Sequence, residues 1–248
     1  MCEDNKTWNL EKQAQEFFVY ATLGIVPERM YCDDYKKHFG KLLSKCKNFD
    51  LKAVDYNWYC VFMCARAAYN DLCRTLRYDA KHKSDSKNKD ALKEKENIIN
   101  CICATLTKAI YNDGNIVADA EKLFSVFNVN GNNKKHMSDL LDCLKEDDKT
   151  KQKIHFGQVQ KWVNMTLKYL YLLGIVNDNS KLQIPIDSYI MKALNQQDVP
   201  VPNTAWSRFD YKEYENLCNL YKDKIDMPYI EWEHDAWIIQ AEKEKGVK

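Results

Sequence analysis

The chain has 248 residues, of which only seven are glycine and five are proline, and its 37 basic side chains nearly balance its 36 acidic ones. This length can bury a substantial core, and the scarcity of glycine and proline predicts few tight turns and a mainly helical protein. A formal net charge of +1 argues against strong nonspecific binding to nucleic acid, so any phosphate-binding surface has to be local.

The sequence shows no pattern of a membrane or secreted protein. No apolar run approaches the ~20 residues that span a bilayer, and the N-terminal residues lack the basic-then-apolar order of a signal peptide. We therefore expect a cytoplasmic protein that has no membrane partner.

The ten cysteines are expected to be reduced thiols in such a compartment. The closest pairs are Cys60 with Cys64 and Cys101 with Cys103, and neither pair has the C-x-x-C spacing of a metal-binding or redox motif. Free cysteine commonly packs as a small apolar residue, so the pattern favours core packing over a zinc or iron-sulfur site. We predict no metal and no cofactor.

The first part of the chain, residues 1–150, contains a series of helical patterns. Apolar side chains recur at helical spacing in residues 9–25, 33–47, 98–111, 116–127 and 136–145. Residues 55–77 are apolar on most faces yet short for a membrane span, which predicts a helix buried in the middle of the protein.

Two polar segments interrupt these helices. Residues 78–97 carry charges of both signs and almost no large apolar groups, which predicts an exposed loop near residues 78–92 that runs into the first turns of a helix. Residues 128–133, Asn-Val-Asn-Gly-Asn-Asn, suggest a calcium loop but lack the ordered D-x-D-x-D-G with a distal glutamate. A plain turn is therefore favoured there.

The last part, residues 196–248, begins with an irregular segment that contains two prolines. Helices are predicted at residues 211–221 and from Pro228 onward. There is no internal repeat and no alternation of strands with helices that would predict a parallel sheet. We therefore predict one all-α domain over residues 1–248.

The central part, residues 151–195, holds the features that suggest chemistry. The apolar residues between positions 159 and 173 form one stripe of a helix, while Lys161, Asn164 and Lys168 fall together on the opposite side. This pattern predicts that Lys161 points away from the core. Its place near the start of the helix suits a phosphate or another anion, because unpaired N–H groups and the positive end of the helix dipole lie there.

Simpler interpretations of the two candidate residues stay open at this point. Lys161 can be a solvated lysine on an amphipathic helix, since lysine is usually exposed. Asp187, in the sequence Ile184-Pro185-Ile186-Asp187, can simply cap the helix that runs through Leu194. Spacing alone does not decide between these roles and catalytic ones.

Two short stretches resemble a known family. The nine residues from Phe156 to Asn164, FGQVQKWVN, resemble the second half of the helix-hairpin-helix of the base-excision DNA glycosylases, especially the 8-oxoguanine branch with its Pro-Gly-Val-Gly-Thr-Lys hairpin. Ile184-Pro185-Ile186-Asp187 is similar to the Val-Pro-Val-Asp of that branch, and the order of the two stretches is the same. Val159 stands where the family has its second hairpin glycine.

The resemblance implies a helix-hairpin-helix glycosylase-like fold with two packed helical lobes around a cleft. It places Lys161 at the family's Schiff-base lysine and Asp187 at the carboxylate that stabilises positive charge on the sugar. The residues expected to contact nucleic acid are Gly157, Gln158, Gln160, Lys153 and Lys168.

The leading hypothesis is a DNA glycosylase, a hydrolase with or without β-lyase activity, that excises a damaged or modified base flipped out of the duplex. The alternative is a non-catalytic protein that binds a nucleotide or nucleic acid on the same scaffold, since a fold does not fix a function. DNA or a modified nucleotide is the expected partner in both cases. A protein-interaction role, indicated only by the abundant aromatic residues, is a third possibility.

Overall fold

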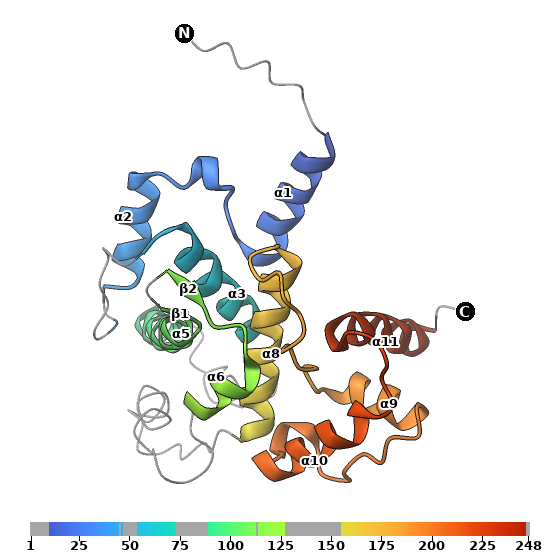
Figure 1. Ribbon diagram of the computed structural model, residues 1–248. Helices are drawn as coiled ribbons and strands as arrows, with labels where there is room; N and C mark the ends of the chain where they lie inside the picture. The colour runs from blue at the N-terminus through green and yellow to red at the C-terminus, as the bar shows by residue number, and fades with distance from the viewer. Residues whose placement is uncertain are drawn as a thin grey trace.

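The computed structural model describes residues 10–44, 46, 54–72, 89–112, 114–126 and 155–246, and this part of the chain is predominantly helical (Figure 1). The helices before residue 127 are α1 (Leu10–Leu23), η1 (Glu28–Met30), α2 (Asp33–Leu42), α3 (Tyr56–Leu72), α5 (Lys89–Ile110) and α6 (Ala120–Val126). Those after residue 154 are α8 (Phe156–Leu172), α9 (Ser188–Gln196), η3 (Trp206–Arg208), α10 (Tyr211–Lys222) and α11 (Tyr229–Lys245). The prediction of an all-α protein is confirmed.

Strand structure in the described residues is limited to one small hairpin. β1 (Tyr111–Asn112) pairs antiparallel with β2 (Asn115–Ile116), and Tyr111 lies opposite Ile116. Gly114 lies between the two strands with a positive φ of 81°, a backbone conformation that glycine adopts without strain. The chain therefore reverses tightly directly after α5.

Some sequence predictions fall outside the described residues. These are the turn at residues 128–133, the helix at residues 136–145, most of the charged loop, and Lys153. The helix that the sequence predicts after the charged loop begins at Lys89, so residues 89–92 belong to the first turn of α5 and not to the loop. Lysine, alanine and leucine in this segment are good helix formers, and their intrinsic preference outweighs the polar composition.

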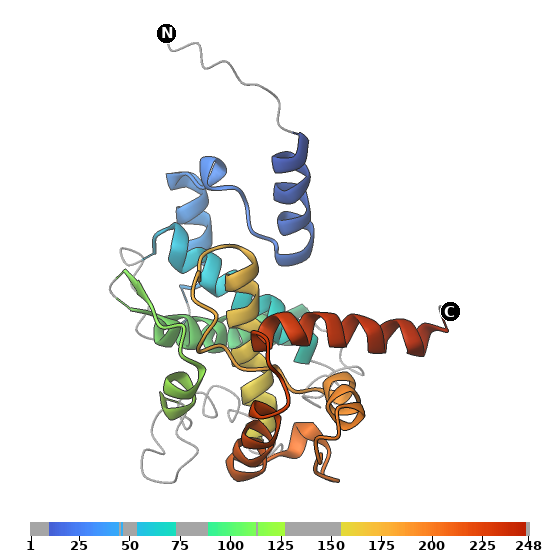
Figure 2. The same cartoon turned by 45° about the vertical axis from the view of Figure 1, so that its right-hand side comes forward.

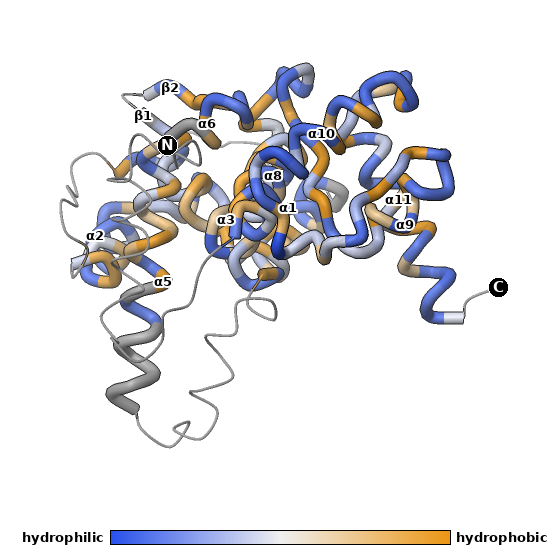
Figure 3. The backbone as a smooth tube through the Cα atoms, turned by 90° about the horizontal axis from the view of Figure 1, so that it is seen from below, coloured by the Kyte–Doolittle hydropathy of each residue, from blue (hydrophilic) through white to orange (hydrophobic). Residues whose placement is uncertain are grey.

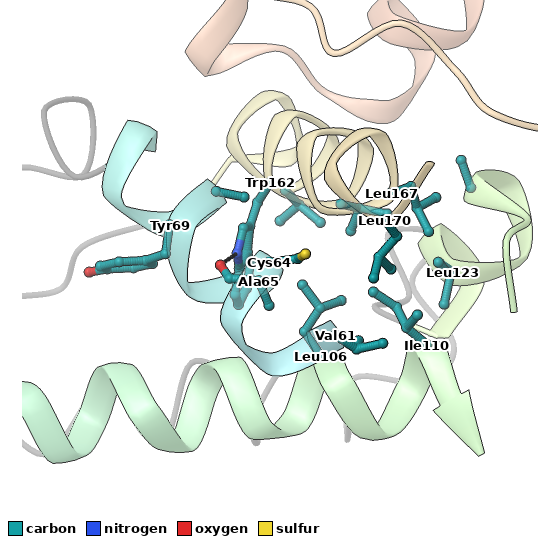
Figure 4. Close-up of a cluster of buried hydrophobic side chains, with 14 of the residues drawn as sticks. Val61, Cys64, Ala65, Tyr69, Leu106, Ile110, Leu123, Trp162, Leu167 and Leu170 are labelled. Atoms are coloured by element: carbon teal, nitrogen blue, oxygen red, sulfur yellow. Dashed lines mark hydrogen bonds between the residues drawn. The ribbon is translucent and has the colours of Figure 1, made fainter. Parts of the chain in front are cut away.

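The core is organised around α3, which lies between α5 and α8 (Figure 4). As its all-round apolar sequence predicts, α3 is buried along most of its length. The indole N–H of Trp162 on α8 donates a 2.8 Å hydrogen bond to the Ala65 carbonyl on α3, and the Trp162 ring meets Tyr69 edge-on. Figure 3 shows the apolar positions of α3 and α8 at the centre of the described part.

α8 is buried on both sides, so the polar side that carries Lys161 is covered by protein, and Lys161 is not a solvated surface lysine. Asn164 is 1% exposed and Lys168 is 8% exposed. The Asn164 amide donates to the Tyr214 hydroxyl on α10 and to the Ile184 carbonyl, at 3.1 and 3.2 Å. The C-terminal segments cover the polar side of α8, so its polar residues bind protein groups there.

Gly157, the second residue of α8, allows one of these segments to approach closely. A Cβ atom at this position would lie 1.8 Å from the Trp206 carbonyl oxygen of η3, far inside contact distance. The Gly157 N–H donates a 3.0 Å hydrogen bond to the Phe209 carbonyl. A glycine is therefore required where the start of α8 meets η3.

α1 and α11 extend from the body at opposite ends of the chain (Figure 2). α1 exposes Phe17, Phe18 and Tyr20, whereas the first two turns of α11 pack inward through the buried residues Ile230 and Glu233. Among the helices that the structure describes, none combines the length and apolar character needed to cross a membrane.

Candidate functional site

Asp187 caps α9, as one of the sequence interpretations predicts. Its Oδ1 atom accepts hydrogen bonds from the backbone N–H groups of Tyr189 and Ile190, at 2.9 and 3.0 Å. The preceding Ile184 and Ile186 are fully buried and anchor the extended segment that delivers Asp187 to the helix start. One carboxylate oxygen is therefore used to hold the backbone.

The second carboxylate oxygen faces Lys161. The distance from Lys161 Nζ to Asp187 Oδ2 is 2.9 Å, and the indole N–H of Trp237 on α11 donates to the same oxygen at 3.2 Å. The side chains of Lys161 and Asp187 are only 12% and 11% exposed. Two residues that are 26 positions apart thus form a largely buried, directional pair, and four hydrogen-bond donors fix the carboxylate.

Aromatic rings surround this pair. The Lys161 ammonium lies 5.2 Å from the centre of the Trp206 ring, a distance at which a cation–π attraction operates. The Trp237 and Tyr189 rings pack against each other with centres 5.3 Å apart. Lys161 and Asp187 therefore lie among flat apolar surfaces from η3, α9 and α11.

Gln160 connects α8 to the segment that carries Asp187. Its amide nitrogen donates to the carbonyls of Gly157 and Ile186, at 2.9 and 2.8 Å, and its amide oxygen accepts from the Ile186 N–H at 3.1 Å. The side chain is fully buried. Gln160, expected from the resemblance to contact nucleic acid, instead joins the backbone before Asp187 to the helix of Lys161.

A second ion pair lies deeper between α8 and α11. Lys168 contacts Glu233, which is 2% exposed. Burial raises the pKa of the Glu233 carboxyl, and the neighbouring Lys168 ammonium opposes that rise; Asp187 raises this pKa and Lys161 lowers it. The two pairs are therefore electrostatically coupled. Sequence reasoning missed Glu233, whose only signal was an acidic residue in the second turn of a tryptophan-rich helix.

The remaining predicted site residues that the structure describes, Gly157 and Gln158, have protein partners. The side chain of Gln158 accepts a 3.1 Å hydrogen bond from the His155 N–H, which closes the start of α8. Gly157 is bonded to Phe209 as described above. In this conformation the start of α8 uses these groups internally. Within the part of the chain that is described, no group of three or more His, Cys, Asp or Glu side chains is placed to hold a metal ion.

The chain matches no protein-family model, no curated protein and no solved structure. The roles of Lys161 and Asp187 are therefore inferred from their geometry alone.

Proposed function

We propose that this chain is a DNA N-glycosylase in which Lys161 is the nucleophile and Asp187 the electrostatic stabiliser. The observation that carries the proposal is the 2.9 Å contact between the Lys161 amine and the Asp187 carboxylate in a largely buried site. The proposal includes a helix-hairpin-helix glycosylase-like fold with two lobes around a cleft, a cytoplasmic location, and DNA as partner without a cofactor or metal.

The arrangement suits removal of a flipped-out base. When the bond between sugar C1′ and the base nitrogen breaks, its electron pair leaves with the base, and positive charge develops on the sugar. The Asp187 carboxylate can stabilise this charge without reorganising, because the N–H groups of Tyr189, Ile190 and Trp237 already fix its position.

Lys161 is placed for the covalent step. The ammonium must lose a proton before it attacks, and Asp187 Oδ2 is an acceptor at hydrogen-bond distance. As this proton moves, the amine nitrogen forms a bond to C1′; the C1′–O4′ bond then breaks, O4′ takes up a proton, and the nitrogen lone pair forms the C=N bond of a protonated imine. Loss of a C2′ proton then breaks the C3′–O bond and cleaves the strand, which is the β-lyase reaction.

Burial distinguishes this pair from an ordinary surface ion pair. Exposed pairs contribute roughly 0–1 kcal/mol and are common on helices. Lys161 and Asp187 are almost removed from water, and a neutral pair of similar shape often stabilises a fold as well as buried charges do. Capping of α9 accounts for an aspartate at position 187, but stability alone gives little reason to pair it with a buried lysine, whereas catalysis does.

Borohydride trapping tests the proposal. Duplexes that carry candidate modified bases are incubated with the protein and borohydride, which reduces an imine to a stable protein–DNA adduct. The wild type should form the adduct and Lys161→Ala should not. Lys192→Ala is the matched control, because Lys192 lies on the neighbouring α9 with its side chain 55% exposed. An adduct that persists in Lys161→Ala would exclude Lys161 as the nucleophile.

The structure also favours a second candidate, a non-catalytic protein that binds a nucleotide or nucleic acid. The observation behind it is that the Gly157 N–H and the Gln158 and Gln160 side chains are used internally, so the start of α8 offers fewer groups to a DNA phosphate. Calorimetry with nucleotides and oligonucleotides separates the candidates. Saturable binding, with DNA that stays intact through long incubation and no trapped adduct, would favour the binding protein.

A further inference from the structure

A pair of cysteines lies far from each other in sequence but close in space. Cys46 follows α2 and Cys101 lies in the middle of α5, and their Sγ atoms are 2.8 Å apart. Two carbon atoms in nonbonded contact are roughly 3.5–4.0 Å apart, and sulfur is larger. Sulfur atoms in a disulfide are about 2.05 Å apart, so the distance between the two Sγ atoms has to shorten by less than about 1 Å for a bond to form.

The two thiols are also accessible and chemically distinct. Both Cys46 and Cys101 are partly exposed, whereas Cys103, two positions along the same helix, is fully buried. The hydrogen bond with Cys46 lowers the pKa of the Cys101 thiol, although partial burial opposes this effect. A thiol with a lowered pKa carries more thiolate, which is the reactive form.

The other described thiols whose pKa is perturbed behave in the opposite way. Burial raises the pKa of Cys60 to about 12 and that of Cys218 to about 11, and it also raises the pKa values of Cys64 and Cys103. Buried thiols of this kind are poor nucleophiles and lie out of reach of solutes. Oxidants should therefore select Cys101 among these thiols.

We propose that Cys46 and Cys101 form a site of reversible oxidative modification, at which a hydroperoxide converts the two thiols into an intramolecular disulfide. The Cys101 thiolate attacks a peroxide oxygen, the O–O bond breaks and hydroxide leaves, which gives a sulfenic acid on Cys101. The Cys46 thiolate then attacks the Cys101 sulfur, an S–S bond forms, the S–O bond breaks and hydroxide leaves, to be protonated to water. Two thiols lose two electrons, and hydrogen peroxide is reduced to two water molecules.

This disulfide would join two segments that both lie beside α3, the residues after α2 and the middle of α5. Phe39 of α2 packs against Trp58 and Phe62 of α3, and α5 packs along the same helix. The link would therefore close a covalent loop that contains α3 in sequence, and it would tie α5 to the segment after α2. Lys161 lies on α8, and neither cysteine contacts its ion pair with Asp187 among the described contacts.

Mass spectrometry of the folded full-length protein tests the proposal. Cys101 and Cys103 share one tryptic peptide, residues 96–108, so the experiment uses Cys103→Ser to remove this ambiguity. After treatment with hydrogen peroxide, alkylation of free thiols and digestion without reductant, we expect peptide 96–108 joined to the peptide that contains Cys46. The joined mass should be about 2 Da below the sum of the two reduced peptides, and dithiothreitol should reverse it.

Two variants separate the oxidation of Cys101 from the formation of the disulfide. In Cys46→Ser, Cys101 should stop at the sulfenic acid and be trapped by dimedone; in Cys101→Ser, no disulfide should form at Cys46. In untreated protein, Cys101 should react with iodoacetamide at least about tenfold faster than Cys103. The proposal is overturned if Cys46 and Cys101 remain free while other cysteines oxidise, or if Cys46 pairs with a different cysteine.

Discussion

The replacement of Asp187 by asparagine or alanine tests whether its two oxygens have separate structural roles. Oδ1 caps α9 through Tyr189 and Ile190, and Oδ2 pairs with Lys161. Asparagine caps a helix about as well as aspartate, so Asp187→Asn should keep the cap and lose only the charge that neutralises Lys161. Asp187→Ala should lose both.

The expected losses of unfolding free energy follow from the burial of the Lys161–Asp187 pair. Breaking a buried ion pair costs roughly 3–5 kcal/mol, and because Lys161 keeps a little solvent contact we expect the lower end, about 3 kcal/mol, for Asp187→Asn. Loss of the cap adds about 1 kcal/mol, so Asp187→Ala should lose about 4 kcal/mol of unfolding free energy. Lys161→Met should cost less, roughly 1–2 kcal/mol, because three N–H donors still satisfy the carboxylate.

Urea unfolding of the two single variants and the double variant Lys161→Met/Asp187→Asn measures the pair directly. The double variant should lose clearly less than the sum of the two single losses, with a coupling energy of about 1–2 kcal/mol, because neither charge is left alone. If Asp187→Asn unfolds like the wild type, or if the single losses simply add, the ion pair described here does not exist in solution.

Three further predictions concern the surroundings of this pair. Gly157→Ala should destabilise the fold by roughly 1–3 kcal/mol or more in thermal unfolding, because the added methyl overlaps a backbone oxygen of Trp206; an unchanged melting temperature would mean that η3 does not pack there. Gln160→Ala should lose roughly 3 kcal/mol, from three buried hydrogen bonds at about 1 kcal/mol each, and should weaken borohydride trapping; Gln240→Ala, which removes a buried glutamine bonded to Gln196, should leave trapping unchanged. The Glu233 carboxyl should make the free energy of unfolding depend on pH, because its pKa in the folded protein is raised above the ordinary value of 4.5. The native state therefore binds this proton more tightly than the unfolded state does. As the pH rises from 4.5 through the raised pKa, the wild type should lose stability relative to Glu233→Gln. Chemical denaturation of both proteins across that range checks the sign, and a difference that grows in favour of the wild type with rising pH would contradict it.

Local sequence patterns predicted several helices closely. The pattern at residues 55–77 corresponds to α3 (Tyr56–Leu72), and the pattern at residues 211–221 corresponds to α10 (Tyr211–Lys222). Pro228 directly precedes α11, where its fixed φ suits the start of a helix. These features depend on residues within one or two helical turns of each other, so they can be read from the sequence.

The capping role of Asp187 was also local, since its partners are two and three residues away. Its second role, the ion pair with Lys161, depends on residues far apart in the sequence. Contact with Lys161 depends on the path of the chain between positions 161 and 187, and Gln160 fixes that path by bonding to the Ile186 backbone. A buried glutamine that holds a backbone segment looks the same in sequence as an exposed one.

The helical class, the buried helix α3 and the positions of Lys161 before α9 and Asp187 at its start can be read from local sequence patterns. Three features come from packing between distant segments: the polar side of α8 is covered, Glu233 pairs with Lys168 on that side, and Cys46 contacts Cys101. The physical reason is that helix formation depends mainly on neighbours in sequence, whereas burial of a polar side chain depends on segments that pack from far along the chain.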